Sequence, residues 1–170
     1  MKNQTKELVW MAMYLALFVV LDYLANLLPI FKMPNGGTLG LGTIPLILAS
    51  YHLGWKKGVI VGVLSVALQF LTGQMYVVDF FQFLLEYLFA FGIYGICCLF
   101  PTWKWFYSGV AVTNLIRLCF HWVAGVLYWK TTWWASLVYQ CWYMIPTMIL
   151  GLVLVPLIMK ALPKKETVKS

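Results

Sequence analysis

The sequence predicts an all-α integral membrane protein, a six-transmembrane-helix bundle with its N- and C-termini in the cytoplasm. Of its 170 residues, 63% are hydrophobic and only 10% are charged. A soluble domain of this length could not bury so many apolar side chains. The apolar residues fall in long stretches between short polar breaks, and about 20 such residues cross a bilayer as a helix. We therefore expect a single multi-pass membrane domain over residues 1–170.

The predicted spans are separated by chemically distinct breaks. The first span is too long for a signal peptide and lacks a small-x-small cleavage site, so we expect it to be retained. It ends at Pro29 and the run "KMPNGGTLG", and the later breaks are "WKKG", "TGQMYVVD", "FPTWKW" and "YWKTTWW". Spans two and three are short, which favours tilting or burial of one against the rest. The six predicted spans are residues 8–29, 39–54, 57–73, 79–100, 106–128 and 133–160.

Basic residues predict the orientation of the bundle. Lysines near span ends concentrate on the cytoplasmic side of membrane proteins. An even number of spans puts both termini on the same side of the membrane. That side carries Lys2, Lys6, Lys56, Lys57, Lys104, Lys160, Lys164, Lys165 and Lys169. The other side carries only Lys32 and Lys130, so both ends are predicted to be cytoplasmic.

Three polar side chains are predicted to meet at one depth in the outer half of the membrane. At about 1.5 Å per residue, Glu86, His121 and Gln140 each lie about 10 Å below the outer end of their span. Arg117 lies one turn deeper. Aromatic residues in the outer loops lie just above this level: Tyr76, Trp129, Trp133 and Trp134.

Two interpretations of Glu86 remain open on this evidence. A charged side chain in the bilayer costs roughly 2.5–3.5 kcal/mol on insertion scales, so Glu86 must face protein or water. It either pairs with Arg117 as a structural brace between two helices, or faces a cavity and contacts a ligand. A carboxylate, hydrogen-bonding groups and aromatic rings together suit a flat cationic or heteroaromatic solute. Asp22 and Asp79 are expected to be interface or helix-cap residues.

Several classes of protein are excluded by what the sequence lacks. There is no Gly-x-x-x-x-Gly-Lys-Ser/Thr phosphate loop, no nucleophile–base pair and no metal-ligand spacing. The four cysteines fall in apolar segments as packing residues. The net charge of +7 reflects lysines flanking the spans, not a nucleic-acid surface. We expect no enzyme activity, no cofactor and no metal, and any pumping must use an ion gradient or a separate subunit.

Four stretches of the chain resemble one known family. They are "TGQMYVVDFFQFLLEYLFAF", "RLCFHWVAGVLYW", "MPNGGTLGLGTIPLILASYHLGWKKG" and "YQCWYMIPTMI". They are similar to the thiamine-specific S components (ThiT type) of energy-coupling-factor (ECF) vitamin transporters. The resemblance implies a six-helix subunit of the bacterial plasma membrane that binds thiamine, or a similar small cationic heteroaromatic ligand, from outside. It also implies partners, namely one ECF coupling subunit and two ATPase subunits.

The resemblance assigns roles to individual residues. Glu86 matches the acidic residue that faces the thiazolium of thiamine, and His121 matches the pocket histidine. Trp129 and Tyr76 match pocket aromatics. Arg117 stands where the family has a basic residue, which supports a structural ion pair with Glu86.

The first span carries the expected docking residues. Ala12 and Ala16 form a small-xxx-small pair, and such pairs let another helix approach closely. They match the Ala-x-x-x-Ala pattern through which these subunits contact the coupling subunit.

The chain also departs from the family pattern. Ala135 and Gln140 replace a tyrosine and an asparagine, and the glycine near position 36 replaces a tryptophan of the first outer loop. Trp134 or Tyr139 would have to supply the lost ring. A related cationic or pyrimidine vitamin precursor therefore remains an alternative ligand. A stand-alone ion-coupled carrier using Glu86 and His121 is a further alternative, although the sequence shows no inverted halves.

Overall fold

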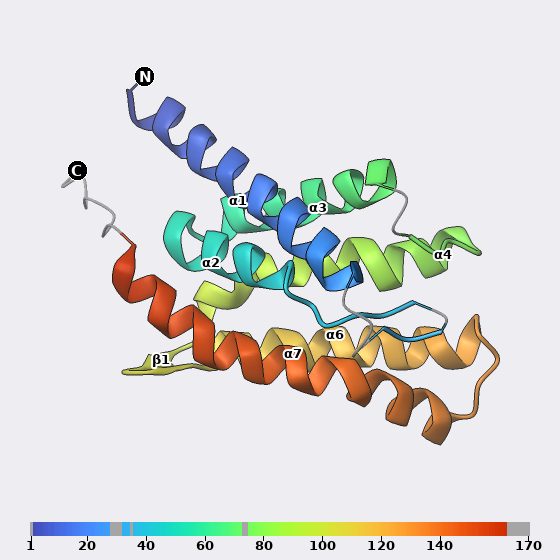
Figure 1. Ribbon diagram of the computed structural model, residues 1–170. Helices are drawn as coiled ribbons and strands as arrows, with labels where there is room; N and C mark the ends of the chain where they lie inside the picture. Colours follow the sequence, from blue (N-terminus) through green and yellow to red (C-terminus); the bar gives the residue numbers. More distant parts are fainter. Residues whose placement is uncertain (1, 28–31, 35, 73–74, 163–170) are drawn as a thin grey trace.

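The computed structural model describes residues 2–27, 32–34, 36–72 and 75–162. Pro29 and the lysines Lys164, Lys165 and Lys169 lie outside the described residues. The described chain is a bundle of long helices with one small antiparallel hairpin (Figure 1). The regular helices are α1 (Lys2–Leu27), α2 (Thr43–Leu53), α3 (Trp55–Thr72), α6 (Ser108–Leu127) and α7 (Trp133–Ala161).

The fourth apolar segment is a composite helix. Asp79 caps its start by accepting from the backbone N–H groups of Phe81 and Gln82, as expected for a helix-cap residue. The segment then changes hydrogen-bond pattern three times along one continuous rod. Its parts are α4 (Phe80–Phe83), the π-helix η2 (Leu84–Phe89), α5 (Ala90–Gly92) and the 3₁₀ helix η3 (Ile93–Leu99).

Within the described residues, five helical segments are long and apolar enough to cross a membrane. This confirms the predicted helical membrane protein but only five of its six spans. The predicted second span, residues 39–54, contains only the 11-residue helix α2. At 1.5 Å per residue it measures about 16 Å, roughly half a hydrocarbon core.

The short helix α2 lies at the centre of the bundle. Ten of its residues are buried, and it packs against α1, α3, η3 and α7. A helix that is apolar on every side is stable only when surrounded. Gly54 ends α2 with a φ of 88°, a left-handed conformation that suits glycine, and α3 starts at the next residue.

The predicted fifth span begins two residues later than expected. Residues 102–107 form a hairpin in which β1 (Thr102–Trp103) pairs antiparallel with β2 (Phe106–Tyr107), and α6 starts at Ser108. The hairpin, the start of α1 and the end of α7 all lie at the same end of the bundle (Figure 1). Which side of the membrane this end faces stays a prediction.

Candidate ligand-binding site

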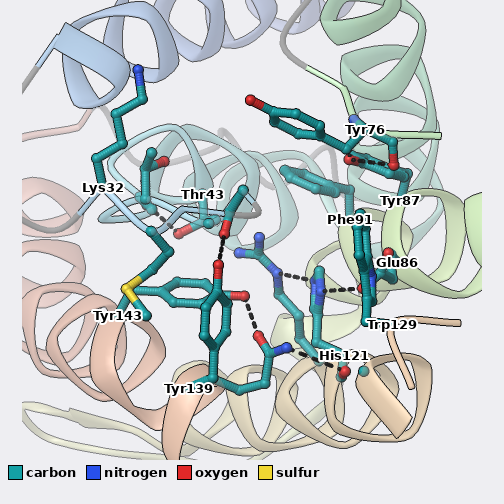
Figure 2. A pocket seen from close by; sticks show the side chains of 18 of the residues that line it. Lys32, Thr43, Tyr76, Glu86, Tyr87, Phe91, His121, Trp129, Tyr139 and Tyr143 are labelled. Carbon is teal, nitrogen blue, oxygen red and sulfur yellow. Dashed lines mark hydrogen bonds and ion pairs between the residues drawn. The ribbon is translucent and has the colours of Figure 1, made fainter. Parts of the chain in front are cut away.

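A cavity of about 190 Å³ lies where α4 begins and α6 is followed by α7 (Figure 2). These element ends are at the opposite end of the bundle from the hairpin in Figure 1. Side chains from α1, α3, the composite fourth helix, α6 and α7 line the cavity, together with the loop before α2. Six of the seven predicted ligand residues are among them: Tyr76, Glu86, His121, Trp129, Tyr139 and Gln140.

Glu86 lies in the π-helix and is 6% exposed. A π-helical turn carries an extra residue and is frequently found at functional sites. Here it places the carboxylate against two partners, His121 in the cavity wall and the fully buried Gln82. Glu86 Oε1 is 3.6 Å from His121 Nδ1, and Gln82 Nε2 donates to the other carboxylate oxygen. The charge is therefore buried but not neutralised by a permanently charged partner.

Arg117 contacts the imidazole of His121 instead of Glu86. Arg117 Nε donates to His121 Nε2 at 3.4 Å, and its Nη1 donates to the hydroxyl of Tyr94 at 3.2 Å. The guanidinium also lies 4.6 Å from the ring centre of Phe91, a favourable cation–π distance. In the described part of the chain no ion pair joins Arg117 to Glu86. The predicted ion pair is therefore wrong, because the imidazole lies between the two groups.

This order fixes the tautomer of the histidine. Because Nε2 accepts from Arg117, the ring proton of a neutral His121 is on Nδ1, which faces Glu86. Arg117 and His121 are four residues apart on α6, so their side chains share one face of the helix. Arg117, His121 and Glu86 thus follow one another in a row of side chains, all of which line the cavity. Figure 2 shows His121 and Glu86 side by side in this row.

The α7 wall is held by hydrogen bonds to α6 and to the loop before α2. Gln140 is buried; its Nε2 donates to the backbone oxygen of His121 at 3.3 Å, and Tyr143 donates its hydroxyl proton to Gln140 Oε1. Tyr139 donates to the backbone oxygen of Gly36 at 2.8 Å. Gln140 thus fixes the backbone beside His121. Tyr139, which is labelled in Figure 2, attaches the loop to α7.

The aromatic residues at the cavity mouth differ from the predicted set in one member. Trp129 is partly buried and lines the cavity, and Tyr76 lines it while remaining 54% exposed. Trp134 is 74% exposed and is not part of the lining. The lining stripe of α7 runs through Ser136, Gln140 and Tyr143, and Trp134 lies on the opposite side of the helix. The prediction that Trp134 lines the pocket is therefore wrong.

Several lining residues are absent from the predicted set. Asp22, expected at an interface, lines the cavity from α1, and Gln69 lines it from α3. Both are polar groups inside apolar segments, which is the signal that identified Glu86. Other lining residues missed from the sequence are aromatic and indistinguishable there from packing residues: Tyr87, Phe91 and Tyr143. Among the residues described, no group of His, Cys, Asp and Glu side chains could hold a metal ion.

The fold and the polar cavity define a multi-pass membrane protein with an internal small-molecule site. Comparison with known proteins then gives the family. Residues 8–167 match the family described as thiamine transporter protein (Thia_YuaJ), and the chain belongs to this family.

Two individual proteins are similar over almost the whole chain. The thiamine transporter ThiT of Bacillus subtilis (strain 168) is 27% identical over 186 residues, covering 95% of this chain and 96% of that protein. The solved structure of ThiT from Listeria monocytogenes has the same fold, with a TM-score of 0.77, 21% identity, and coverage of 94% of this chain and 96% of that chain. The predicted ThiT-type membership is confirmed. So is the prediction that the protein is not an enzyme, because its relatives are named as transporters.

Proposed function

We propose that the protein captures thiamine from outside the cell, as the S component of an ECF importer in the bacterial plasma membrane. The observation that carries this proposal is the buried carboxylate of Glu86 in the wall of the cavity. Its contacts are an imidazole and an amide, not the nearby guanidinium. A cationic ligand can supply the opposite charge that Glu86 otherwise lacks.

The surroundings of Glu86 suit the two rings of thiamine. Tyr87, Phe91 and Trp129 bring aromatic surface into the same cavity, and a cation over such rings gains about 0.5–2 kcal/mol each when desolvated. The thiazolium carries a permanent positive charge, and the aminopyrimidine offers hydrogen-bonding edges. The amide of Gln140 retains one N–H beyond its bond to His121 for such an edge.

The departure from the family at Gly36 has a structural counterpart. Gly36 has a φ of 89°, and a Cβ built there would lie 3.1 Å from the Tyr76 ring. Tyr76 therefore covers the position at which the family carries a tryptophan. Of the two candidates for the lost ring, Tyr139 is supported over Trp134, because Tyr139 lines the cavity and donates to the Gly36 oxygen.

The proposal is tested by the charge of Glu86. We expect the purified protein to bind thiamine tightly, with quenching of tryptophan fluorescence. Glu86→Gln keeps the shape of the side chain but removes its charge, and should weaken binding by about 100-fold or more. Asp79→Asn is the matched control, because it removes a carboxylate from the same segment outside the cavity and asparagine still caps a helix.

The outcomes of this experiment separate the alternatives. Unchanged affinity in Glu86→Gln would remove Glu86 from the site. Tighter binding of a related cationic pyrimidine compound than of thiamine would reassign the ligand and keep the mechanism. Uptake by liposomes that contain this protein alone would favour the stand-alone ion-coupled carrier.

The proposed coupling to an ATPase module rests on α1. Ala12 and Ala16 are both exposed on this helix, so a small-residue face is open for the close approach of another helix. We place the contact with the ECF coupling subunit, which joins two ATPase subunits, on this face. ATP hydrolysis by these partners would then drive the uptake step.

A further inference from the structure

Gln69 carries a buried hydrogen-bond donor that the described protein does not satisfy. The side chain is on α3, is 5% exposed and lines the cavity. Among the described residues, its Nε2 has no hydrogen-bond partner. Leaving such a group unpaired costs more than a hydrogen bond gains, so nearly all buried polar groups in proteins are paired. An unpaired donor in a cavity wall therefore points to an acceptor on the ligand.

Asp22 provides an acceptor near the same level of the bundle. The carboxylate of Glu7 on α1 forms an ion pair with Lys57 on α3, and both helices run from the β1 end toward the cavity end (Figure 1). At 1.5 Å per residue, Gln69 lies about 18 Å beyond Lys57 along α3. Asp22 lies about 22 Å beyond Glu7 along α1. The two side chains are thus about one helical turn apart in height, and both line the cavity.

We propose that Asp22 and Gln69 form a second polar subsite, the α1–α3 subsite, which binds a hydroxyl group of the ligand. A hydroxyl both donates and accepts, so it can donate to the Asp22 carboxylate and accept from Gln69 Nε2 together. This inference rests on the proposed function, and it assigns the hydroxyethyl group of thiamine to the α1–α3 subsite. The cationic ring then remains with Glu86 on the neighbouring wall.

The subsite also gives the cavity a means of selection. A site with a buried donor and acceptor rejects a ligand that lacks the matching group, because both protein groups are then left unpaired. The analogue of thiamine with ethyl in place of hydroxyethyl keeps both rings and the positive charge. It should therefore bind the wild-type protein about tenfold or more weakly than thiamine.

The test combines this analogue with Gln69→Met, a substitution of nearly equal size without a donor. Gln69→Met should bind thiamine about tenfold more weakly than the wild type. It should also discriminate between thiamine and the analogue by less than about threefold, because the two changes remove the same hydrogen bond. Gln4→Met, on an exposed position of α1 outside the cavity, should leave both affinities unchanged.

Thermal unfolding of the ligand-free variants separates binding from a structural role. If Nε2 serves the ligand, Gln69→Met removes an unpaired donor and its melting temperature should equal or exceed that of the wild type. A lower melting temperature together with unchanged discrimination would overturn the proposal. The proposal would also be overturned if Gln69→Met had the melting temperature of the wild type and still discriminated fully between thiamine and the ethyl analogue. Failure of the wild type to bind thiamine would overturn the proposed function as well, whereas tight binding without discrimination sinks the α1–α3 subsite alone.

Discussion

The carboxylate of Glu86 is kept available by the side chain next to it. His121 presents Nδ1 to Glu86 while Nε2 accepts from Arg117. A direct ion pair with a guanidinium would offset much of the negative charge, but a neutral imidazole 3.6 Å from the carboxylate adds no permanent charge. Arg117 in turn is stabilised by the ring of Phe91 and the hydroxyl of Tyr94. The imidazole therefore separates two charges that a tighter arrangement would pair.

The two tryptophans near the cavity mouth provide a matched pair of substitutions. Trp129→Ala should weaken thiamine binding by about tenfold, because it removes a ring from the cavity that can stack on a cation. Trp134→Ala should leave affinity unchanged, since the side chain is 74% exposed and outside the lining. Isothermal titration calorimetry on both purified variants measures the difference, and equal losses would contradict the placement.

At the residue scale, the sequence predicts how deep a residue lies in the membrane better than it predicts the direction in which its side chain points. Helix rise alone brings Glu86, His121 and Gln140 to one level, and all three line the cavity. The partner of Arg117 could not be predicted, because an imidazole and a carboxylate at neighbouring depths are both within reach of a long side chain. Trp134 was misplaced for a related reason: its loop position indicates height but not the face of α7 on which it lies.

Among the elements, α3 and η3 make a close backbone approach, and glycine permits it. A Cβ on Gly95 would lie 2.2 Å from the backbone nitrogen of Val59, and one on Gly58 would lie 2.7 Å from the Gly95 oxygen. Small residues at such crossings let membrane helices pack backbone to backbone. Ser50 of α2 completes the junction by donating to the Gly95 oxygen at 2.6 Å and accepting from the Cys98 nitrogen.

Two glycines of this segment should respond differently to an added methyl group. Gly95→Ala forces α3 away from η3 and should lower the free energy of unfolding by about 1–3 kcal/mol. Gly92→Ala meets only Val63 Cγ2, at 3.9 Å, an ordinary contact, and should change stability little. Reversible unfolding in mixed micelles compares the two, and equal stability of both variants would argue against the close crossing.

An apolar stretch of sequence can be longer than the helix that it forms, as the region of α2 shows. Residues 39–54 read as a span because they are apolar, yet the helix covers only Thr43–Leu53. Its start is set by the preceding loop, which carries two backbone groups that α7 satisfies: the Gly40 nitrogen donates to Thr147 Oγ1, and the Gly36 oxygen accepts from Tyr139. Such tertiary partners hold an irregular segment beside a cavity, and the sequence gives no sign of them.

For the molecule as a whole, α1 is the least covered of the long helices. Only 17% of its most apolar window is buried, against 33% or more in the other membrane-capable segments. Its buried face is anchored by Tyr14, whose hydroxyl is 2.8 Å from His52 Nδ1 on α2. Its other face is exposed and includes Ala12 and Ala16. Lipid or a partner helix must cover this face in the membrane.

This arrangement predicts that binding and uptake can be separated. Ala12→Trp combined with Ala16→Trp should leave thiamine affinity intact, because neither residue lines the cavity, but should stop uptake by the assembled complex through steric exclusion of the coupling subunit. Ala67→Trp, on an exposed position of α3, is the control for added bulk. Radiolabelled uptake in proteoliposomes gives the readout, and normal uptake by the double variant would refute the docking face.

The π-helix that carries Glu86 offers a route by which the ligand preference of such a pocket could change during evolution. A segment with one residue more than a regular α-helix needs can lose that residue without breaking the rod. Such a deletion would rotate one half of the segment against the other by about 100°, turning the acidic group out of the chamber and a new side chain into it. A change of ligand could then arise from the deletion of one codon, with the rest of the helical bundle unchanged.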